Sequence, residues 1–197
     1  MTAGGETQTG EVVVSADPRW HGDAQVLRER AKSALEGRNT ATAVNEMLNQ
    51  LDGWETALTA LPKVVGGGDD GDAAKTRKYE AVLKAARELD KKVKELKDKV
   101  YNREIQRDTP SDGLHYHSDF QGKASRLGFL SGAYGEAPRD VVREHLAAIR
   151  TEAEGYLAQF NALRSNEVTA FNKTAAGDGV PTLFVGDAVA IQAVEGN

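Results

Sequence analysis

The chain has 197 residues, of which 25 are basic, 30 are acidic and none is cysteine, giving a formal net charge of −5. The lack of cysteine excludes disulfide frameworks and thiolate metal sites, and the acidic balance excludes a general attraction to nucleic acid. No apolar run approaches the roughly 18 residues of a membrane-spanning helix, and the opening residues have neither the basic nor the apolar stretch of a signal peptide. Aromatic residues make up only 6%, and alanine, glutamate, lysine and leucine recur throughout, which favours helices.

The N-terminal residues indicate one strand of a β-hairpin. Residues 7–14 contain a run of β-branched side chains, which favours a strand. Gly4-Gly5 stands before this run and is a good two-residue hairpin turn. Because only three residues precede that turn, we expect residues 1–16 to be the remnant of a hairpin that ends a preceding β-domain. A disordered tail is the alternative.

A long helix is predicted from about His21 to Leu61, after a helix start at Asp17-Pro18. Its apolar residues recur three and four positions apart, at Leu27, Ala31, Ala34, Val44, Met47, Leu48, Leu51, Trp54, Leu58 and Leu61. Gly37-Arg38-Asn39 interrupts this stripe, and we expect a kink there. Pro62 is expected to end the helix before a glycine-rich linker at residues 66–71.

The second helix, from about Asp72 to Arg107, has the most regular pattern in the chain. Its apolar residues form an unbroken heptad seam, made of Val82, Ala86, Leu89, Val93, Leu96 and Val100. The stretch from Lys75 to Arg103 also contains 11 basic residues and 5 acidic ones. We interpret this surplus as a solvated helix face rather than a phosphate-binding surface, because no aromatic residues alternate with the lysines.

A short third helix is predicted after a break at residues 109–113, with Ser118 as its N-cap in a capping box that ends at Gln121. Its expected inward face consists of Phe120, Ala124, Leu127, Leu130 and Tyr134. Beside the longer helices it leaves about 35 Å of length uncovered, which about 11 extended residues would span. We therefore expect residues 106–117 to climb the bundle in extended form, with Leu114 and Tyr116 packed in a groove.

The fourth helix is predicted from Pro138 to about Ala175, with Gly177 and Gly179 ending it. Its expected seam consists of Val142, Leu146, Ile149, Ala153, Tyr156, Phe160, Leu163 and Ala170. Residues 181–197 form an apolar tail in which Gly186-Asp187 favours a small hairpin.

These elements together predict an all-α fold. Residues 17–180 are expected to form an antiparallel up-down-up-down four-helix bundle with three long helices and one short. The short N-terminal strand and the C-terminal hairpin are expected to lie outside that bundle.

Several stretches of the chain resemble a bacterial protein family. They are Glu11–Val14 (EVVV) before Asp17-Pro18-Arg19, Leu51–Trp54 (LDGW), the run from Tyr101-Asn102 through the proline-containing loop to Pro138, and Phe160–Asn172 (FNALRSNEVTAFN) before Gly179-Val180-Pro181. In this arrangement the chain is similar to the C-terminal helical domain of large bacterial proteins with sortilin-type, BNR-repeat β-propellers, often named "glycosyl hydrolase, BNR repeat". The resemblance covers about Glu11 to Pro181, and its motifs are not catalytic ones.

The resemblance implies a function as part of a larger protein. It implies an immunoglobulin-like β-domain before the helices, and a parent protein that is exported to the periplasm or the exterior. We expect a non-catalytic docking or assembly module, whose partners are its own upstream propeller and immunoglobulin-like domains or a second copy of itself. The alternatives are an accessory part of a glycoside-hydrolase-like enzyme that shapes the propeller's cleft, and an independent metal- or ligand-binding bundle.

The residues of the chain offer few candidates for chemistry. His115 and His117 form the only His-x-His pair and are weak metal-ligand candidates, with Asp112, Asp119 or His145 as a third ligand. No nucleophile elbow, phosphate loop or dinucleotide motif occurs, so we expect no catalytic residue and no cofactor in this chain. Three interaction residues are predicted instead: Trp20 at the junction between strand and helix, and Leu114 and Tyr116 in the loop.

Overall fold

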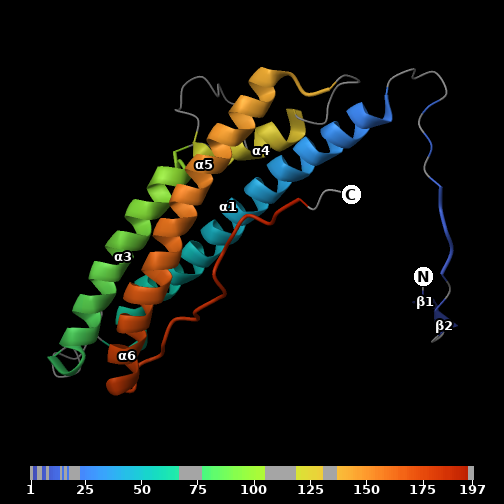
Figure 1. The fold of residues 1–197 in the computed structure, drawn as a ribbon. Coiled ribbons are helices and arrows are strands. Elements are labelled where there is room, and N and C mark those ends of the chain that lie inside the picture. The colour runs from blue at the N-terminus through green and yellow to red at the C-terminus, as the bar shows by residue number, and fades with distance from the viewer. Residues whose placement is uncertain are drawn as a thin grey trace.

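The computed structural model describes residues 2–3, 6–7, 9–13, 15, 17, 23–66, 77–104, 119–130 and 137–194. Its elements are the strands β1 (Thr2–Ala3) and β2 (Glu6–Thr7), the helices α1 (Ala24–Val64), α3 (Glu80–Val100), α4 (Phe120–Leu130), α5 (Asp140–Ala162) and α6 (Thr169–Gly177), and the π-helix η1 (Leu163–Val168). The body of the molecule is helical (Figure 1), which confirms the predicted class. Within the described residues, no helix is both long and apolar enough to cross a membrane.

The N-terminal strand is shorter than the sequence indicates. β1 and β2 pair antiparallel, with Thr2 opposite Thr7 and Ala3 opposite Glu6, so that two residues separate the strands. The prediction of one strand across residues 7–14 is wrong, because β2 ends at Thr7 and residues 9–13 belong to no strand. A strand needs a neighbour for its main-chain hydrogen bonds, and β1 offers only two residues.

Helix α1 spans 41 residues, or about 61 Å. It begins at the N-cap Asp23, whose carboxylate accepts a hydrogen bond from the Gln25 amide at 2.9 Å. The helix continues without a break through residues 37–39, where we expected a kink, and through Pro62, which we expected to end it. A proline in the last turn removes one amide donor but leaves the next turn able to close, and the Val65 amide still donates to the Leu61 carbonyl at 3.0 Å.

The heptad seam of α3 is confirmed, because all of its residues are buried: Val82, Ala86, Leu89, Val93, Leu96 and Val100. The helix is nevertheless shorter than predicted. It ends at Val100, and Tyr101 is already extended, with φ −127° and ψ 121°. Helix α3 therefore packs only along the C-terminal half of α1, where the Lys97 ammonium lies 2.9 Å from the Glu55 carboxylate.

Helix α4 begins beside the end of α3. Its N-cap is Asp119 rather than the predicted Ser118, because Asp119 Oδ1 accepts a hydrogen bond from the Gly122 amide at 2.8 Å. Asp119 Oδ2 accepts a second bond from the Asn102 amide at 3.1 Å. A Cβ on Gly122 would lie 2.7 Å from Asp119 Oδ1, so a side chain at this position would require the capping carboxylate to shift.

The end of α3 and the start of α4 lie side by side, because the Asn102 amide and the Asp119 carboxylate are hydrogen-bonded. Residues 106–117, predicted to climb the bundle by about 35 Å in extended form, lie outside the described residues. Helix α4 covers the N-terminal half of α1, where Gln121 donates to Asn45 at 3.0 Å.

Helices α5 and α6 are joined through η1 into one continuous helical run. The next buried residue after Leu163 is Val168, five positions on, as in the wider turn of a π-helix. Phe171 and Ala175 are then buried, whereas the predicted Ala170 is exposed. The end at Gly177 agrees with the prediction: Gly179 has φ +67°, and the Val180 amide donates to the Ala175 carbonyl at 2.8 Å, a Schellman motif.

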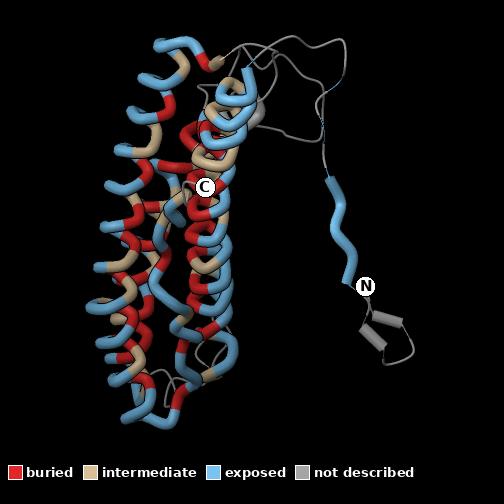
Figure 2. The backbone as a smooth tube through the Cα atoms, turned by 45° about the vertical axis from the view of Figure 1, so that its right-hand side comes forward, coloured by how far each residue is buried: buried red, intermediate tan, exposed pale blue. Residues whose placement is uncertain are grey.

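One apolar core runs along the helices, seen as the buried line between them in Figure 2. At its centre the rings of Trp54 and Phe160 are stacked, with centroids 5.2 Å apart. Near the start of α4, Phe120 meets Tyr156 edge-on, with centroids 5.1 Å apart. These pairs join α1 to α5 and α4 to α5.

We expect Leu51→Ala to lower the free energy of unfolding by about 2–5 kcal/mol, because Leu51 is fully buried and its truncation leaves a cavity. Urea denaturation followed by circular dichroism measures the loss. The control is Lys91→Ala on the exposed face of α3, which should change the value by less than about 0.5 kcal/mol. Equal effects of the two substitutions would contradict this description of the core.

Candidate interaction site

Residues 181–194 cross the helices as an extended segment without regular secondary structure, which we call the C-terminal strap (Figure 1, red). The predicted hairpin at Gly186-Asp187 is wrong, because no second strand lies beside the strap within the described residues. An extended segment still needs partners for its main-chain amides and carbonyls. Side chains of the helices supply them.

Two asparagines bind the strap main chain through both halves of their side-chain amides. Asn172 Oδ1 accepts from the Leu183 amide at 2.7 Å, and its Nδ2 donates to the Leu183 carbonyl at 2.8 Å. Asn161 does the same for Val189, at 3.1 Å and 2.8 Å. Each asparagine therefore acts toward the strap as a neighbouring strand residue would.

The other contacts are also directed at main-chain carbonyls. Arg164 donates to Gly186 at 2.9 Å, and Asn39 donates to Gln192 at 3.1 Å. With the two asparagine pairs, the bound strap residues are 183, 186, 189 and 192, a period of three. The residues that come directly after 183 and 186 bind α1 through their carbonyls. The Trp54 indole donates to the Phe184 carbonyl at 2.9 Å, and Gln50 donates to the Asp187 carbonyl at 3.3 Å.

A period of three is that of the polyproline-II helix, which repeats every three residues and makes no internal hydrogen bonds. The side chains follow the same period. Val180, Leu183 and Val189 are buried, whereas Phe184 is 84% exposed. At Gly186 a Cβ would lie 2.5 Å from Gln50 Oε1, so the groove has no room for a side chain there unless Gln50 moves.

The sequence carries a sign of this groove in the repeated dipeptides Phe160-Asn161 and Phe171-Asn172. In each, the phenylalanine is buried in the core and the next residue binds the strap. The two asparagines are 11 positions apart, which is about three helical turns. This stretch is part of the resemblance described above, but its pattern alone indicates no role for the two asparagines.

A cluster of charged residues joins the C-terminal half of α1 to α3. Glu55 lies 2.9 Å from Lys97 and 2.8 Å from Arg103, while Asp52 also contacts Lys97 and Asp98 contacts Arg103. The hydrogen bond from Arg103, together with that from Lys97, lowers the pKa of Glu55 from 4.5 to about 2, against the effect of burial. The same contacts raise the pKa of Arg103.

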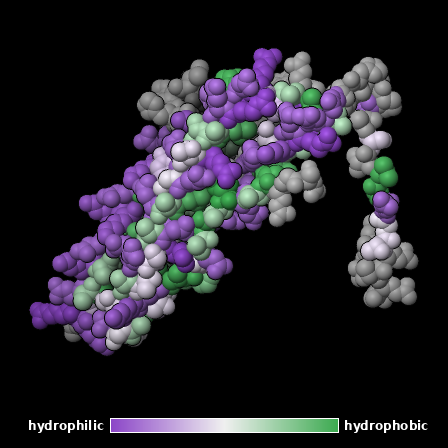
Figure 3. All heavy atoms as spheres, in the orientation of Figure 1, coloured by the Kyte–Doolittle hydropathy of each residue, from purple (hydrophilic) through white to green (hydrophobic). Residues whose placement is uncertain are grey.

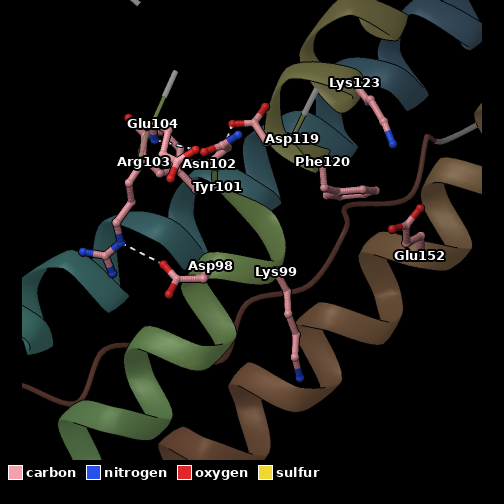
Figure 4. Close-up of a pocket in the computed structure, with 10 residues that line it drawn as sticks. All are labelled: Asp98, Lys99, Tyr101, Asn102, Arg103, Glu104, Asp119, Phe120, Lys123 and Glu152. Carbon is pink, nitrogen blue, oxygen red and sulfur yellow. Dashed lines mark hydrogen bonds and ion pairs between the residues drawn. The ribbon is translucent and has the colours of Figure 1, made fainter. Parts of the chain in front are cut away.

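A cavity of about 430 Å³ lies where α3 ends and α4 begins (Figure 4). Three of its four acidic residues hold structural contacts: Asp98 pairs with Arg103, Asp119 caps α4, and Glu152 accepts a hydrogen bond from the Tyr156 hydroxyl at 3.0 Å. Burial and this bond to Glu152 raise the pKa of Tyr156. These three acids are therefore engaged in holding the helices rather than arranged as a catalytic pair.

The interaction and metal candidates from the sequence, Trp20, Leu114, Tyr116, His115 and His117, lie outside the described residues, as does Asp112. Of the proposed third ligands, Asp119 is the α4 cap and His145 is exposed on α5. In the part of the chain that the structure describes, no group of three or more histidine and acidic residues is placed to hold a metal ion.

Comparison of the chain with protein-family models, with curated proteins and with solved structures gives no match.

We expect Asn172→Ala to lower the free energy of unfolding by about 1–3 kcal/mol, because it leaves the amide and carbonyl of Leu183 without their partner. Amide hydrogen exchange should show faster exchange at Leu183. The control is Asn49→Ala at an exposed position of α1, which makes the same change in helix propensity. If both variants leave exchange at Leu183 unchanged, the asparagine does not hold the strap.

Acid should weaken the fold partly through Glu55. Its pKa in the folded protein is lowered from 4.5 to about 2, so its stabilising effect is present above about pH 4.5 and is lost as the pH falls toward 2. We expect Glu55→Gln to be less stable than wild type at pH 7 and to lose less stability between these two pH values. Urea denaturation across this range measures the effect, with Glu46→Gln, exposed on the same helix, as the control.

Proposed function

We propose that the chain is a non-catalytic helical docking or assembly module of a larger, exported bacterial protein that carries a BNR-repeat β-propeller and an immunoglobulin-like domain. The observation that carries the proposal is the surface between α1 and the α5–η1–α6 run that holds the strap, which we call the strap groove. Six side chains of the helices, one of them the Trp54 indole, donate hydrogen bonds to main-chain carbonyls of an extended segment. Two of the six, both asparagines, also accept hydrogen bonds from main-chain amides of that segment. Such a surface is suited to holding polypeptide.

We infer an up-down-down-up arrangement as the finer description of the fold, in place of the up-down-up-down order expected from the sequence. Helix α1 runs in one direction, α3 and then α4 return along it, and α5 with η1 and α6 follow the direction of α1. The ion pairs support this order, because Lys97 near the end of α3 meets Asp52 and Glu55, while Arg143 at the start of α5 meets Glu29 near the start of α1. On the lower half, the strap takes the place that a fourth helix has in other bundles.

The N-terminal extension supplies the second support for docking. The N-terminal segment lies apart from the helices (Figures 2 and 3). In its residues 9–13, which belong to no helix or strand, Val12 and Val13 are 83% and 84% exposed. Adjacent exposed valines in an extended stretch suit the edge of a β-sheet. We propose that residues 9–13 pair with the β-domain that precedes the helices in the parent protein.

Gel filtration with light scattering on this chain, with and without the upstream β-domains, tests the proposal. We expect a monomer that binds those domains when they are added as separate proteins. The double substitution Val12→Ser and Val13→Ser should weaken binding by tenfold or more, because burying each valine is worth about 1.5 kcal/mol or more. The control is Val141→Ser, an exposed valine on α5.

Two other results would change the assignment. A stable dimer that ignores the β-domains would make the chain an assembly device rather than an intramolecular docking module. Equal binding by the Val12/Val13 double variant and by wild type would remove the N-terminal extension from the interface.

A further inference from the structure

The strap groove recognises the main-chain conformation of the bound segment more than the segment's amino-acid sequence. The hydrogen bonds that join the helices to strap residues 183–192 are made to the strap's main chain. Three strap positions restrict the side chain most. Leu183 and Val189 are buried, and Gly186 passes against Gln50. Ile191 adds a partly buried contact with the core. A peptide with the same conformation and the same side chains at these positions can make the same contacts.

Rigid donors are spaced along the groove to match a three-residue repeat. Trp54 is fixed by its stack on Phe160 and directs its indole N–H at the Phe184 carbonyl. On the opposite side, Asn172, Arg164 and Asn161 follow one another along α6, η1 and α5 and bind every third residue. Aromatic-lined grooves with hydrogen-bond donors are a recurrent way to bind polyproline-II segments, which lose little entropy on binding.

The groove also continues beyond the last strap contact. The strap runs toward the N-terminus of α1, from Trp54 to Gln50 and then Asn39. On the N-terminal side of Asn39, a cavity of about 450 Å³ lies between α1 and α5, lined among others by Glu36, Ser33 and Leu146. A longer peptide on the same path gains contacts there, which gives it an advantage over the strap that it displaces.

We propose that the groove between α1 and α5–α6 is a binding site for an extended polyproline-II peptide of the form aliphatic-x-x-Gly-x-x-aliphatic, which the C-terminal strap occupies as a tethered competitor. The proposal rests on the docking function above and names the chemistry of the partner. Release of the strap opens the site. A free peptide must overcome the high effective concentration of a tethered one, which is in the millimolar range for short linkers.

The test uses the full chain with a weakened strap and an intact groove. Leu183→Asp with Val189→Asp removes the two buried side chains of the strap and no groove residue. The probe is a fluorescein-labelled synthetic peptide with the native sequence of residues 180–194, and its anisotropy is followed on titration. We expect the weakened-strap variant to bind it at least tenfold more tightly than wild type, with the helical circular dichroism of both unchanged.

Matched substitutions distinguish specific binding in the groove from non-specific binding of the peptide. Adding Asn161→Ala and Asn172→Ala to the weakened-strap variant should abolish binding, because these residues hold the peptide main chain. A peptide with Gly186→Leu should bind at least tenfold more weakly. Ala188→Pro in the peptide should preserve or improve binding, since proline favours the polyproline-II conformation, whereas Leu183→Pro should weaken it by removing the amide that Asn172 accepts.

The proposal is overturned if the weakened-strap variant is folded and binds no peptide. It is also overturned if copies of the chain exchange straps into a dimer, detected by light scattering, while free peptide does not bind, because a second copy would then be the occupant. In either case, binding of the upstream β-domains by the same variant would leave the docking function intact and place it on another surface. Loss of both activities would remove the docking function as well.

Discussion

The fold depends on how the main chain of an extended segment is satisfied where no sheet exists. On the lower half of the molecule, α1, α3 and the α5–α6 run enclose three sides of a core, and the strap covers the groove that remains. Main-chain groups there would be costly to bury without partners. Asn161 and Asn172 solve this by offering an acceptor and a donor each, in the geometry of a paired strand. The burial of Leu183 and Val189 follows from those contacts.

A second constraint is set by Asp119, which holds two elements with one carboxylate. One oxygen caps α4, and the other accepts the Asn102 amide just after α3 ends. The two helices are thereby placed one after the other along α1, so that a helix of 41 residues is covered by two shorter ones. The ion pairs of Glu55 with Lys97 and Arg103 fix the same joint from the side of α1.

The elements that could be predicted from the sequence are those with strict apolar periodicity. The seam of α3 from Val82 to Val100 is buried at every expected position, and Gly177 and Gly179 mark the end of α6 as expected. Periodicity does not report where a helix ends, so α3 was expected to continue past Val100. Nor does it anticipate a π-turn, which moves the buried position from Ala170 to Phe171. The strap groove depends on residues such as Asn39 and Gln192, which are 153 positions apart, and no local pattern relates them.

The distance along the chain between the two sides of the groove has a consequence for synthesis. The Trp54 indole N–H meets its acceptor, the Phe184 carbonyl, only after 130 further residues are made. At ribosomal rates of about 5–20 residues per second, the side of α1 that the strap covers waits roughly 6 to 26 seconds for its partner. For that interval the nascent chain displays an apolar stripe of the kind that chaperones bind. The strap follows all of the described helices in the chain, and it covers the part of α1 that they leave open.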